Sequence, residues 1–141
     1  MAGYSGTPLI KKLGIKPDDK IILRNQPVHY LDWISPLPAG VKVAQKSTAD
    51  VDFIHLFVVE RKIFEKEFNM LKKSLKKDGM MWVSWPKKSS GMPTTVTENV
   101  IRELALPLGF VDVKVCAVSE IWSGLKLVVR KELRKKSLPP A

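Results

Sequence analysis

The segment VDFIHLFVV, residues 51–59, constrains the fold of this chain more than any other feature. A continuous apolar run of this length is typical of a strand with both faces covered, and such strands lie at the centre of parallel sheets. Crossover connections place helices on the faces of a parallel sheet. The run therefore predicts an α/β protein with a buried sheet, in which His55 is a hydrogen-bonded core residue.

Strand and helix patterns alternate along the rest of the chain. Helical patterns occupy residues 7–14, 27–35, 60–79 and 95–107, and strand patterns occupy residues 20–25, 40–45, 79–85, 110–120 and 125–131. The last two strands are separated only by IWSG, a connection that permits only an antiparallel hairpin. We predict a doubly wound, mostly parallel sheet of about six strands, with helices on both faces and a C-terminal antiparallel hairpin. We expect the first four strands in the order two, one, three, four, with the hairpin beside the fourth.

Local signals predict where the helices begin and end. Thr7 can cap the first helix and Gly14 can end it. Thr95 and Glu98 have the spacing of a capping box at the start of the last helix. The long helix predicted over 60–79 is amphipathic, with Phe64, Phe68, Leu71 and Leu75 on one face and Lys62, Lys66, Lys73 and Lys77 on the other. We interpret the lysine face as the solvated back of a helix that docks on the core.

Length and composition indicate one domain. A chain of 141 residues suits a single hydrophobic core. We assign residues 1–133 to a single α/β domain and residues 134–141 to a flexible, basic and proline-rich tail. No apolar run approaches the roughly 18 to 20 residues of a membrane-spanning helix. The start of the chain has no signal-peptide pattern, and the single cysteine, Cys116, has no disulfide partner within the chain, so we expect a cytoplasmic protein.

Residues 50–129 resemble a known fold family. The segments DVDFIHLFV, LKKSLKKDGMMWVSWPK and LGFVDVKVCAVSEIWSGLKLVV look like the fourth to seventh strands, with their flanking turns, of the class I S-adenosylmethionine-dependent methyltransferases. The resemblance implies a Rossmann-like fold that is shortened by one strand and its helix between residues 46 and 51. The whole chain is also similar to a family of short bacterial proteins of unknown function, through GYSGTPLIKKLGIKP, WPKKSSG and KVCAVSEIWSGLKLVVR. That second resemblance implies no particular activity.

The sequence departs from the methyltransferase pattern where the cofactor binds. In that family the first strand ends in a glycine-rich turn and the second in an acid that holds the ribose. This chain has RNQP at residues 24–27, where the freedom that glycine gives is lost, and Gln45 and Lys46 in place of the acid. Asp50 and Asp52 are displaced candidates for that acid. We predict no bound cofactor, and no S-adenosylmethionine in its usual pose.

A binding site is expected beyond the carboxyl ends of the parallel strands, because ligands of open α/β sheets lie there. The loop WPKKSSGMPTT places two lysines and two serines ahead of a helix whose N-terminal amides favour an anion. The tryptophans at 82 and 85 must point to opposite faces of a regular strand, and Trp85 could flank a ligand together with Trp122. The candidate ligand-binding residues are Arg24, Asn25, Gln26, His29, Trp85, Lys87, Lys88, Ser89, Ser90, Glu120 and Trp122.

Three functions remain open. The first is a non-catalytic, methyltransferase-like domain that binds a small anionic ligand or a protein partner, since no nucleophile motif or metal-ligand spacing identifies a catalytic or metal site. The alternative is a methyltransferase with a divergent cofactor loop. The third is a weak, non-specific nucleic-acid binder, because the net charge is +10. That reading requires the lysines of the predicted helix and the basic tail to form one patch, and the sequence leaves this question and the oligomeric state open.

Overall fold

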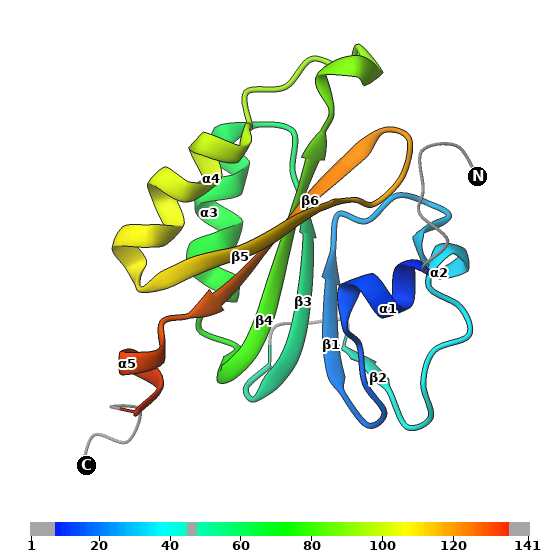
Figure 1. Cartoon of the computed structure of the whole chain (residues 1–141), viewed down its shortest axis with the longest axis vertical. Helices are drawn as coiled ribbons and strands as arrows, with labels where there is room; N and C mark the ends of the chain where they lie inside the picture. Colours follow the sequence, from blue (N-terminus) through cyan, green and yellow to red (C-terminus); the bar gives the residue numbers. More distant parts are fainter. Residues whose placement is uncertain (1–7, 45–47, 136–141) are drawn as a thin grey trace.

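Six strands form one sheet in the order β2-β1-β3-β4-β6-β5 (Figure 1). The computed structural model describes residues 8–44 and 48–135. The first four strands are parallel, and β6 runs antiparallel to both of its neighbours. The predicted order and hairpin are confirmed. The strands are β1 (Lys20–Arg24), β2 (Lys42–Ala44), β3 (Val51–Phe57), β4 (Leu75–Pro86), β5 (Phe110–Ala117) and β6 (Trp122–Val129).

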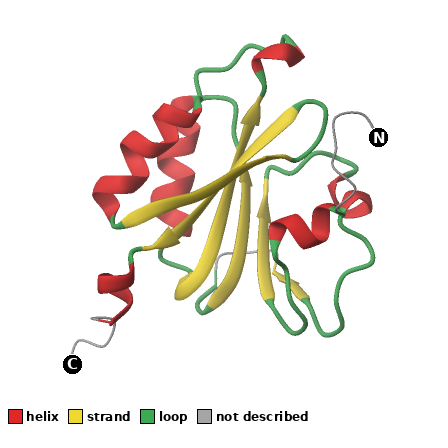
Figure 2. Cartoon of the chain, in the orientation of Figure 1, coloured by secondary structure: helices red, strands yellow, loops and turns green. Residues whose placement is uncertain are grey.

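Helices cover both faces of this sheet, as the sequence predicts (Figure 2). One face carries α3 (Arg61–Leu71) and α4 (Glu98–Ala105), and the other carries α1 (Leu9–Leu13) and α2 (Tyr30–Trp33). Short 3-10 turns, η1 (Lys88–Ser90) and η2 (Leu106–Leu108), follow β4 and α4. A last helix, α5, spans Lys131–Lys135. The chain therefore has the predicted doubly wound α/β architecture.

The central strand β3 is buried from both sides. Ile54 and Leu56 pack in the core beneath α3 and α4, while Phe53 and Phe57 pack in the core beneath α1 and α2. This arrangement explains why the sequence of β3 shows a continuous apolar run rather than an alternating pattern.

The long predicted helix is shorter than its apolar periodicity suggests. It ends at Leu71, and Leu75 begins β4 instead of continuing the apolar helix face. Pairing with β3 explains the difference, because Leu75 lies opposite Val51 and the Lys76 Nζ donates to the Asp52 Oδ1 at 2.8 Å. The predicted lysine face is wrong, since only its first two members, at 62 and 66, lie on α3.

Two further boundaries differ from the prediction, and one lies outside the described residues. The capping box is wrong: Thr97 caps α4, and its Oγ1 accepts from the Val100 N at 3.2 Å. Gly14 ends α1 in the left-handed conformation, with φ of 86°, whereas Thr7 lies outside the described residues. The tail predicted from residue 134 begins inside α5, and residues 136–141 lie outside the described residues. Within the described part of the chain, no helix is long and apolar enough to cross a membrane.

The buried polar residue of β3, His55, has a hydrogen-bond partner on each ring nitrogen. Its Nδ1 lies 2.7 Å from the Tyr30 Oη in α2, and its Nε2 lies 2.8 Å from the Ser84 Oγ in β4. The ring also stacks on Phe57, with centroids 4.3 Å apart. Burial lowers the pKa of His55 to about 3 and raises the pKa of the Tyr30 hydroxyl. His55 is therefore the hydrogen-bonded core residue that the sequence predicts, and it is neutral at physiological pH.

The lowered pKa of His55 makes stability depend on pH. Below about pH 6.5 the unfolded chain binds a proton at this imidazole and the folded chain does not, so the free energy of unfolding should fall as the pH falls. The loss contributed by this group should reach at most about 1.4 kcal/mol for each pH unit between about pH 6 and pH 4. Urea unfolding at several pH values measures it. The His55→Gln variant should be less stable at pH 7 but should lose less stability on acidification, and an equal loss in both proteins would contradict this assignment.

Candidate functional site

The carboxyl ends of the parallel strands bring most of the predicted site residues to one edge of the sheet. β1, β3 and β4 run in the same direction and end there at Arg24, Phe57 and Pro86. The turn between β5 and β6 lies at the same edge, because the Lys87 N donates to the Ile121 O at 2.7 Å. The predicted first-turn residues, the loop after β4 and Glu120 of the hairpin turn therefore share this edge.

The first turn, at the end of β1, is occupied by contacts within the protein. The Arg24 guanidinium points toward α3, where its Nη1 lies 3.4 Å from the Glu67 Oε1. Arg24 and Glu67 are 25% and 15% exposed, and the Glu67 Oε1 has no hydrogen-bond partner. Asn25 has a positive φ of 60°. An asparagine therefore adopts the left-handed conformation that we predicted to be lost together with the glycines of this turn. The Pro27 carbonyl accepts from the Tyr30 N, and α2 follows at once.

Aromatic side chains fill the space beside the ends of β1 and β3. The Phe57 ring meets Tyr30 from α2 and Trp122 from β6 edge-to-face, with centroids 5.3 Å and 5.1 Å apart. Tyr30 and Phe57 are buried, and Trp122 is half-buried. These rings belong to the core under α1 and α2 and are not arranged around an open crevice.

The two predicted ligand-flanking tryptophans lie on opposite faces of the sheet. Trp85 is buried in the core under α3 and α4, whereas Trp122 packs with the core under α1 and α2. The prediction that Trp85 and Trp122 flank one ligand is therefore wrong. Trp82 and Trp85 do point to opposite faces, as predicted, and both are core residues.

The lysine-serine loop, residues 87–90, projects beyond the end of β4 and is separated from α4 by residues 91–97 (Figure 1). Lys88 and Ser89 are exposed, and Lys87 is half-buried. The Ser90 hydroxyl is used inside the turn: it donates to the Lys87 O at 2.7 Å and accepts from the Met92 N at 3.1 Å. The first turn of α4 also holds Glu98, whose carboxylate disfavours an anion there. The two lysines therefore do not lie at a free helix N-terminus.

The exposed polar residues of the edge have few contacts. Gln26 and Glu120 are exposed, and the His29 Nδ1 lies 3.5 Å from the Asp32 Oδ2 in an exposed pair.

The displaced candidates for a ribose-binding acid lie elsewhere. Asp52 is at the start of β3, at the opposite edge of the sheet, where its Oδ2 accepts from the Lys20 N at 2.8 Å. Asp50 precedes it, and residues 45 and 46 lie outside the described residues.

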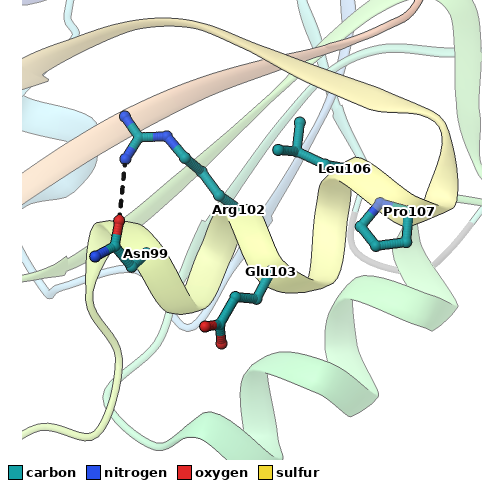
Figure 3. Close-up of a pocket in the computed structure, with 5 residues that line it drawn as sticks. All are labelled: Asn99, Arg102, Glu103, Leu106 and Pro107. Carbon is teal, nitrogen blue, oxygen red and sulfur yellow. Dashed lines mark hydrogen bonds between the residues drawn. The ribbon is translucent and has the colours of Figure 1, made fainter.

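Three hollows of the described surface are lined by residues other than the predicted site residues. One, of about 380 Å³, is lined by Asn99, Arg102, Glu103, Leu106 and Pro107, which all come from α4 and the turn η2 (Figure 3). A second, of about 470 Å³, lies at the amino edge of the sheet around Asp52 and Lys76. A third lies between the end of α3 and α5.

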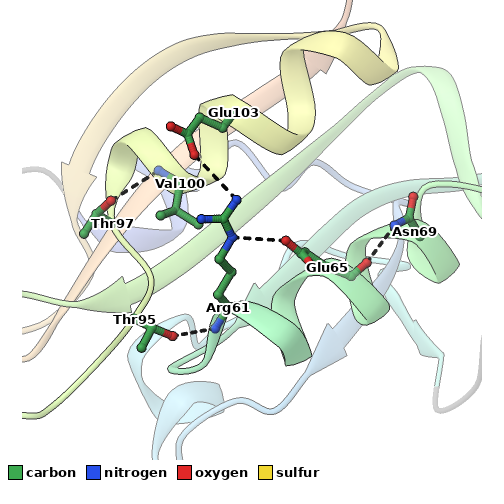
Figure 4. Close-up of polar contacts among 7 residues, drawn as sticks. All are labelled: Arg61, Glu65, Asn69, Thr95, Thr97, Val100 and Glu103. Atoms are coloured by element: carbon green, nitrogen blue, oxygen red, sulfur yellow. Dashed lines mark hydrogen bonds and ion pairs between the residues drawn. The ribbon is translucent and has the colours of Figure 1, made fainter.

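Threonines in the loop after β4 bind the start of α3 by hydrogen bonds at the carboxyl edge of the sheet (Figure 4). The Arg61 N donates to the Thr95 Oγ1 at 2.7 Å, so Thr95 caps α3 from a different segment. The Thr94 Oγ1 and the Thr95 N both donate to the Val59 O, at 2.6 and 3.0 Å. Arg61 also pairs with Glu65 and Glu103, which joins α3 to α4. These contacts hold the loops of the carboxyl edge in place.

Exposed apolar side chains gather on this edge, and sequence analysis missed them. Val28 and Leu31, from the turn before α2 and from α2, are 92% and 46% exposed, and Ile121 in the hairpin turn is 42% exposed. Met92, in the loop after β4, is also exposed. Val28 and Leu31 belong to one segment, Ile121 to a second and Met92 to a third, so only the fold reveals that these three segments share one edge.

Comparison with known proteins supports the fold. No protein-family model matches the chain, and no curated protein matches it. Its structure is similar to that of a SAM dependent methyltransferase from Aquifex aeolicus, with a TM-score of 0.64 and 14% identity over 86% of this chain and 88% of that one. A ribosomal protein L11 methylase from Lactobacillus delbrueckii subsp. bulgaricus gives a TM-score of 0.59 and 13% identity, over 86% and 75% of the two chains. The DhpI-SAH complex gives 0.61 and 10%, over 88% and 83%.

These likenesses show a methyltransferase-like fold, in agreement with the resemblance of residues 50–129. Because the sequence identities are low, the similarity extends to the fold alone. Membership of the family of short bacterial proteins stays a prediction.

The pair between Arg24 and Glu67 should stabilise the first turn. Replacing Arg24 by alanine leaves the largely buried Glu67 carboxylate without its counter-charge, so the free energy of unfolding should fall by about 1–3 kcal/mol. Adding Glu67→Gln should recover part of this loss. The matched control is Arg61→Ala, which removes half-exposed ion pairs and should cost less than about 1 kcal/mol. Chemical denaturation measures all three variants, and equal losses for the two single variants would contradict the assignment.

Proposed function

We propose that this protein is a non-catalytic binding domain with a methyltransferase-like fold, and that it docks a protein partner at the carboxyl edge of its sheet. The observation that carries the proposal is the set of exposed apolar side chains at this edge, where Val28 and Leu31 come from the segment of α2 and Ile121 comes from the hairpin turn, beside the aromatic rings around Phe57. Apolar side chains exposed together are typical of protein-interaction surfaces.

The residues at this edge do not suit S-adenosylmethionine in its usual pose. The cofactor needs a close backbone approach at the first turn and an acid after the second strand. Here Arg24 crosses to Glu67, the Pro27 carbonyl is bonded to the Tyr30 N, and Asp52 lies at the opposite edge. The adjacent space holds Phe57 and its aromatic neighbours.

A protein partner fits this edge better than a small anion does. A small ligand gains most of its affinity from enclosure, whereas the predicted ligand residues Gln26, Lys88 and Glu120 are exposed. A partner that covered Val28, Leu31 or Ile121 would gain about 1.5–3 kcal/mol for each fully buried side chain. The exposed Lys88 and the half-buried Lys87 would then lie at the polar rim of the interface.

A second candidate is a methyltransferase with a divergent cofactor loop. Its support is the similarity of the sheet to proteins described as methyltransferases, one of them in a complex with SAH. The positive φ of Asn25 also keeps one backbone feature of a glycine-containing first turn. The two candidates differ in whether the protein binds S-adenosylmethionine.

Calorimetry with S-adenosylmethionine separates these candidates. We expect no binding heat at millimolar cofactor, and no rise in melting temperature. Binding at about one hundred times the dissociation constant would stabilise the protein by about 2.7 kcal/mol, which thermal-shift measurements detect. Micromolar affinity in the unmodified protein would overturn the non-catalytic function and favour the methyltransferase.

Site-specific crosslinking tests the docking surface. A photo-crosslinking amino acid at position 121 should give one discrete adduct in cells, whereas the same amino acid at position 63 should not, because Ile63 and Ile121 are both 42% exposed but Ile63 lies on α3. Ile121→Asp should weaken binding of the purified partner at least tenfold, since it places a charge in an apolar interface; tenfold corresponds to about 1.4 kcal/mol. Adducts of equal yield at both positions, or full affinity in Ile121→Asp, would contradict the proposal.

A further inference from the structure

One row of side chains runs across five strands on the face that α1 and α2 partly cover. Strand pairing aligns Leu23 with His55, His55 with Trp82, Trp82 with Lys126, and Lys126 with Lys114. The first three members are buried, whereas Lys126 is half-buried and Lys114 is exposed. The row therefore runs from the core under α1 and α2 to the surface, and the two lysines lie beyond the part of the sheet that these helices cover.

These two lysines are direct cross-strand neighbours. Residues opposite each other in an antiparallel pair have Cβ atoms about 4.5–5.5 Å apart, and like charges in such a pair destabilise the sheet. The Lys114 Nζ lies 6.0 Å from the centre of the Trp82 ring, which keeps it over the same face. Burial lowers the pKa of Lys126, and the charges of Lys114 and Lys16 lower it further, so Lys16 of the loop before β1 adds a third positive charge.

The strands that carry Lys114 and Lys126 supply no counter-charge to them, whereas the Asp19 Oδ2 accepts from the Lys16 N at 2.9 Å. In the sequences of β5 and β6 the single acidic residue is Asp112, which lies on the other face, where its Oδ2 accepts from the Arg102 Nε at 3.0 Å. Among residues 8–44 and 48–135, the ammonium groups of Lys16, Lys114 and Lys126 make no ion pair. An anion from outside would relieve their repulsion.

We infer that Lys16, Lys114 and Lys126 form a surface that binds the phosphates of a nucleic-acid strand. The surface is an open sheet face shared by three segments, which suits an extended polyanion better than a single enclosed phosphate. It is distinct from the carboxyl edge, and the inference does not depend on the function proposed there.

The exposure of the lysines and the net charge of +10 favour nucleic acid over an acidic protein segment. A nucleic-acid strand carries a negative charge on every nucleotide, and the counterions condensed on it are released when lysines neutralise its phosphates. Because Trp82 is buried and offers no stacking surface, binding should rest on phosphates alone, independent of sequence and strongly weakened by salt.

Charge-matched variants test the assignment. Lys114→Gln with Lys126→Gln removes two charges from the proposed surface, and Lys62→Gln with Lys66→Gln removes two exposed charges from α3. With a labelled single-stranded oligonucleotide at about 50 mM salt, the first pair should weaken binding about tenfold and reduce the salt slope by about 1.4, while the second pair should change affinity less than twofold. The first pair should be at least as stable as the unmodified protein, because it removes a like-charge contact.

The single cysteine gives a second, local readout. Cys116 lies two residues beyond Lys114 on the same side of β5, and it is partly buried. Bound oligonucleotide should slow alkylation of Cys116 severalfold in the unmodified protein and in the α3 control, but not in Lys114→Gln with Lys126→Gln. Equal loss of affinity in both double variants, unchanged alkylation, or tighter binding to polyglutamate than to the oligonucleotide would overturn the inference.

Discussion

The imidazole of His55 is the constraint around which this structure is organised. A polar ring in the most buried strand is tolerated only if both nitrogens have partners, and Tyr30 and Ser84 provide them at 2.7 and 2.8 Å. To reach His55, Tyr30 must lie directly above the sheet, so α2 has to begin within a few residues of the end of β1. The turn between them is therefore short, and Val28 within it is exposed. One core hydrogen bond thus constrains both the path of the chain after β1 and the edge beside it.

The fold was predictable from sequence because its signals are long and mutually consistent. The apolar run of β3, the alternation of helices and strands, and the short connection before β6 each limit the topology independently. The errors arise where local and long-range preferences conflict. Leu75 continues the helical apolar face but becomes the first residue of β4, because it pairs with Val51 across a parallel connection. Thr95 has capping-box spacing, but its hydroxyl caps α3, a partner that sequence spacing does not identify.

The candidate site was predictable only in its position. Topology places the carboxyl ends together whatever the side chains do, so the edge itself follows from the strand order. The direction of each side chain depends on tertiary partners. Arg24 turns toward Glu67, and Trp85 enters the core under α3 and α4, which the sequence does not indicate. Similarly, Lys114 and Lys126 look unremarkable in two separate strand segments, and only the hairpin register makes them neighbours.

The placement of these two lysines runs against the local rule that like charges avoid each other across a strand pair. Sheets that are selected for stability alone favour an opposite charge or an apolar residue at one of the two positions. In the sequence of β6, Leu125 and Leu127 flank Lys126. Local violations of this kind occur mainly at functional sites, where their cost is offset by well-packed surroundings. Here the offset is visible in the same row, because Trp82 beside Lys126 is fully buried and its Nε1 donates to the Leu13 carbonyl at 2.9 Å. The row that ends in two like charges is therefore anchored at its centre by a fully buried and hydrogen-bonded tryptophan, which allows the lysines to remain without disturbing the fold.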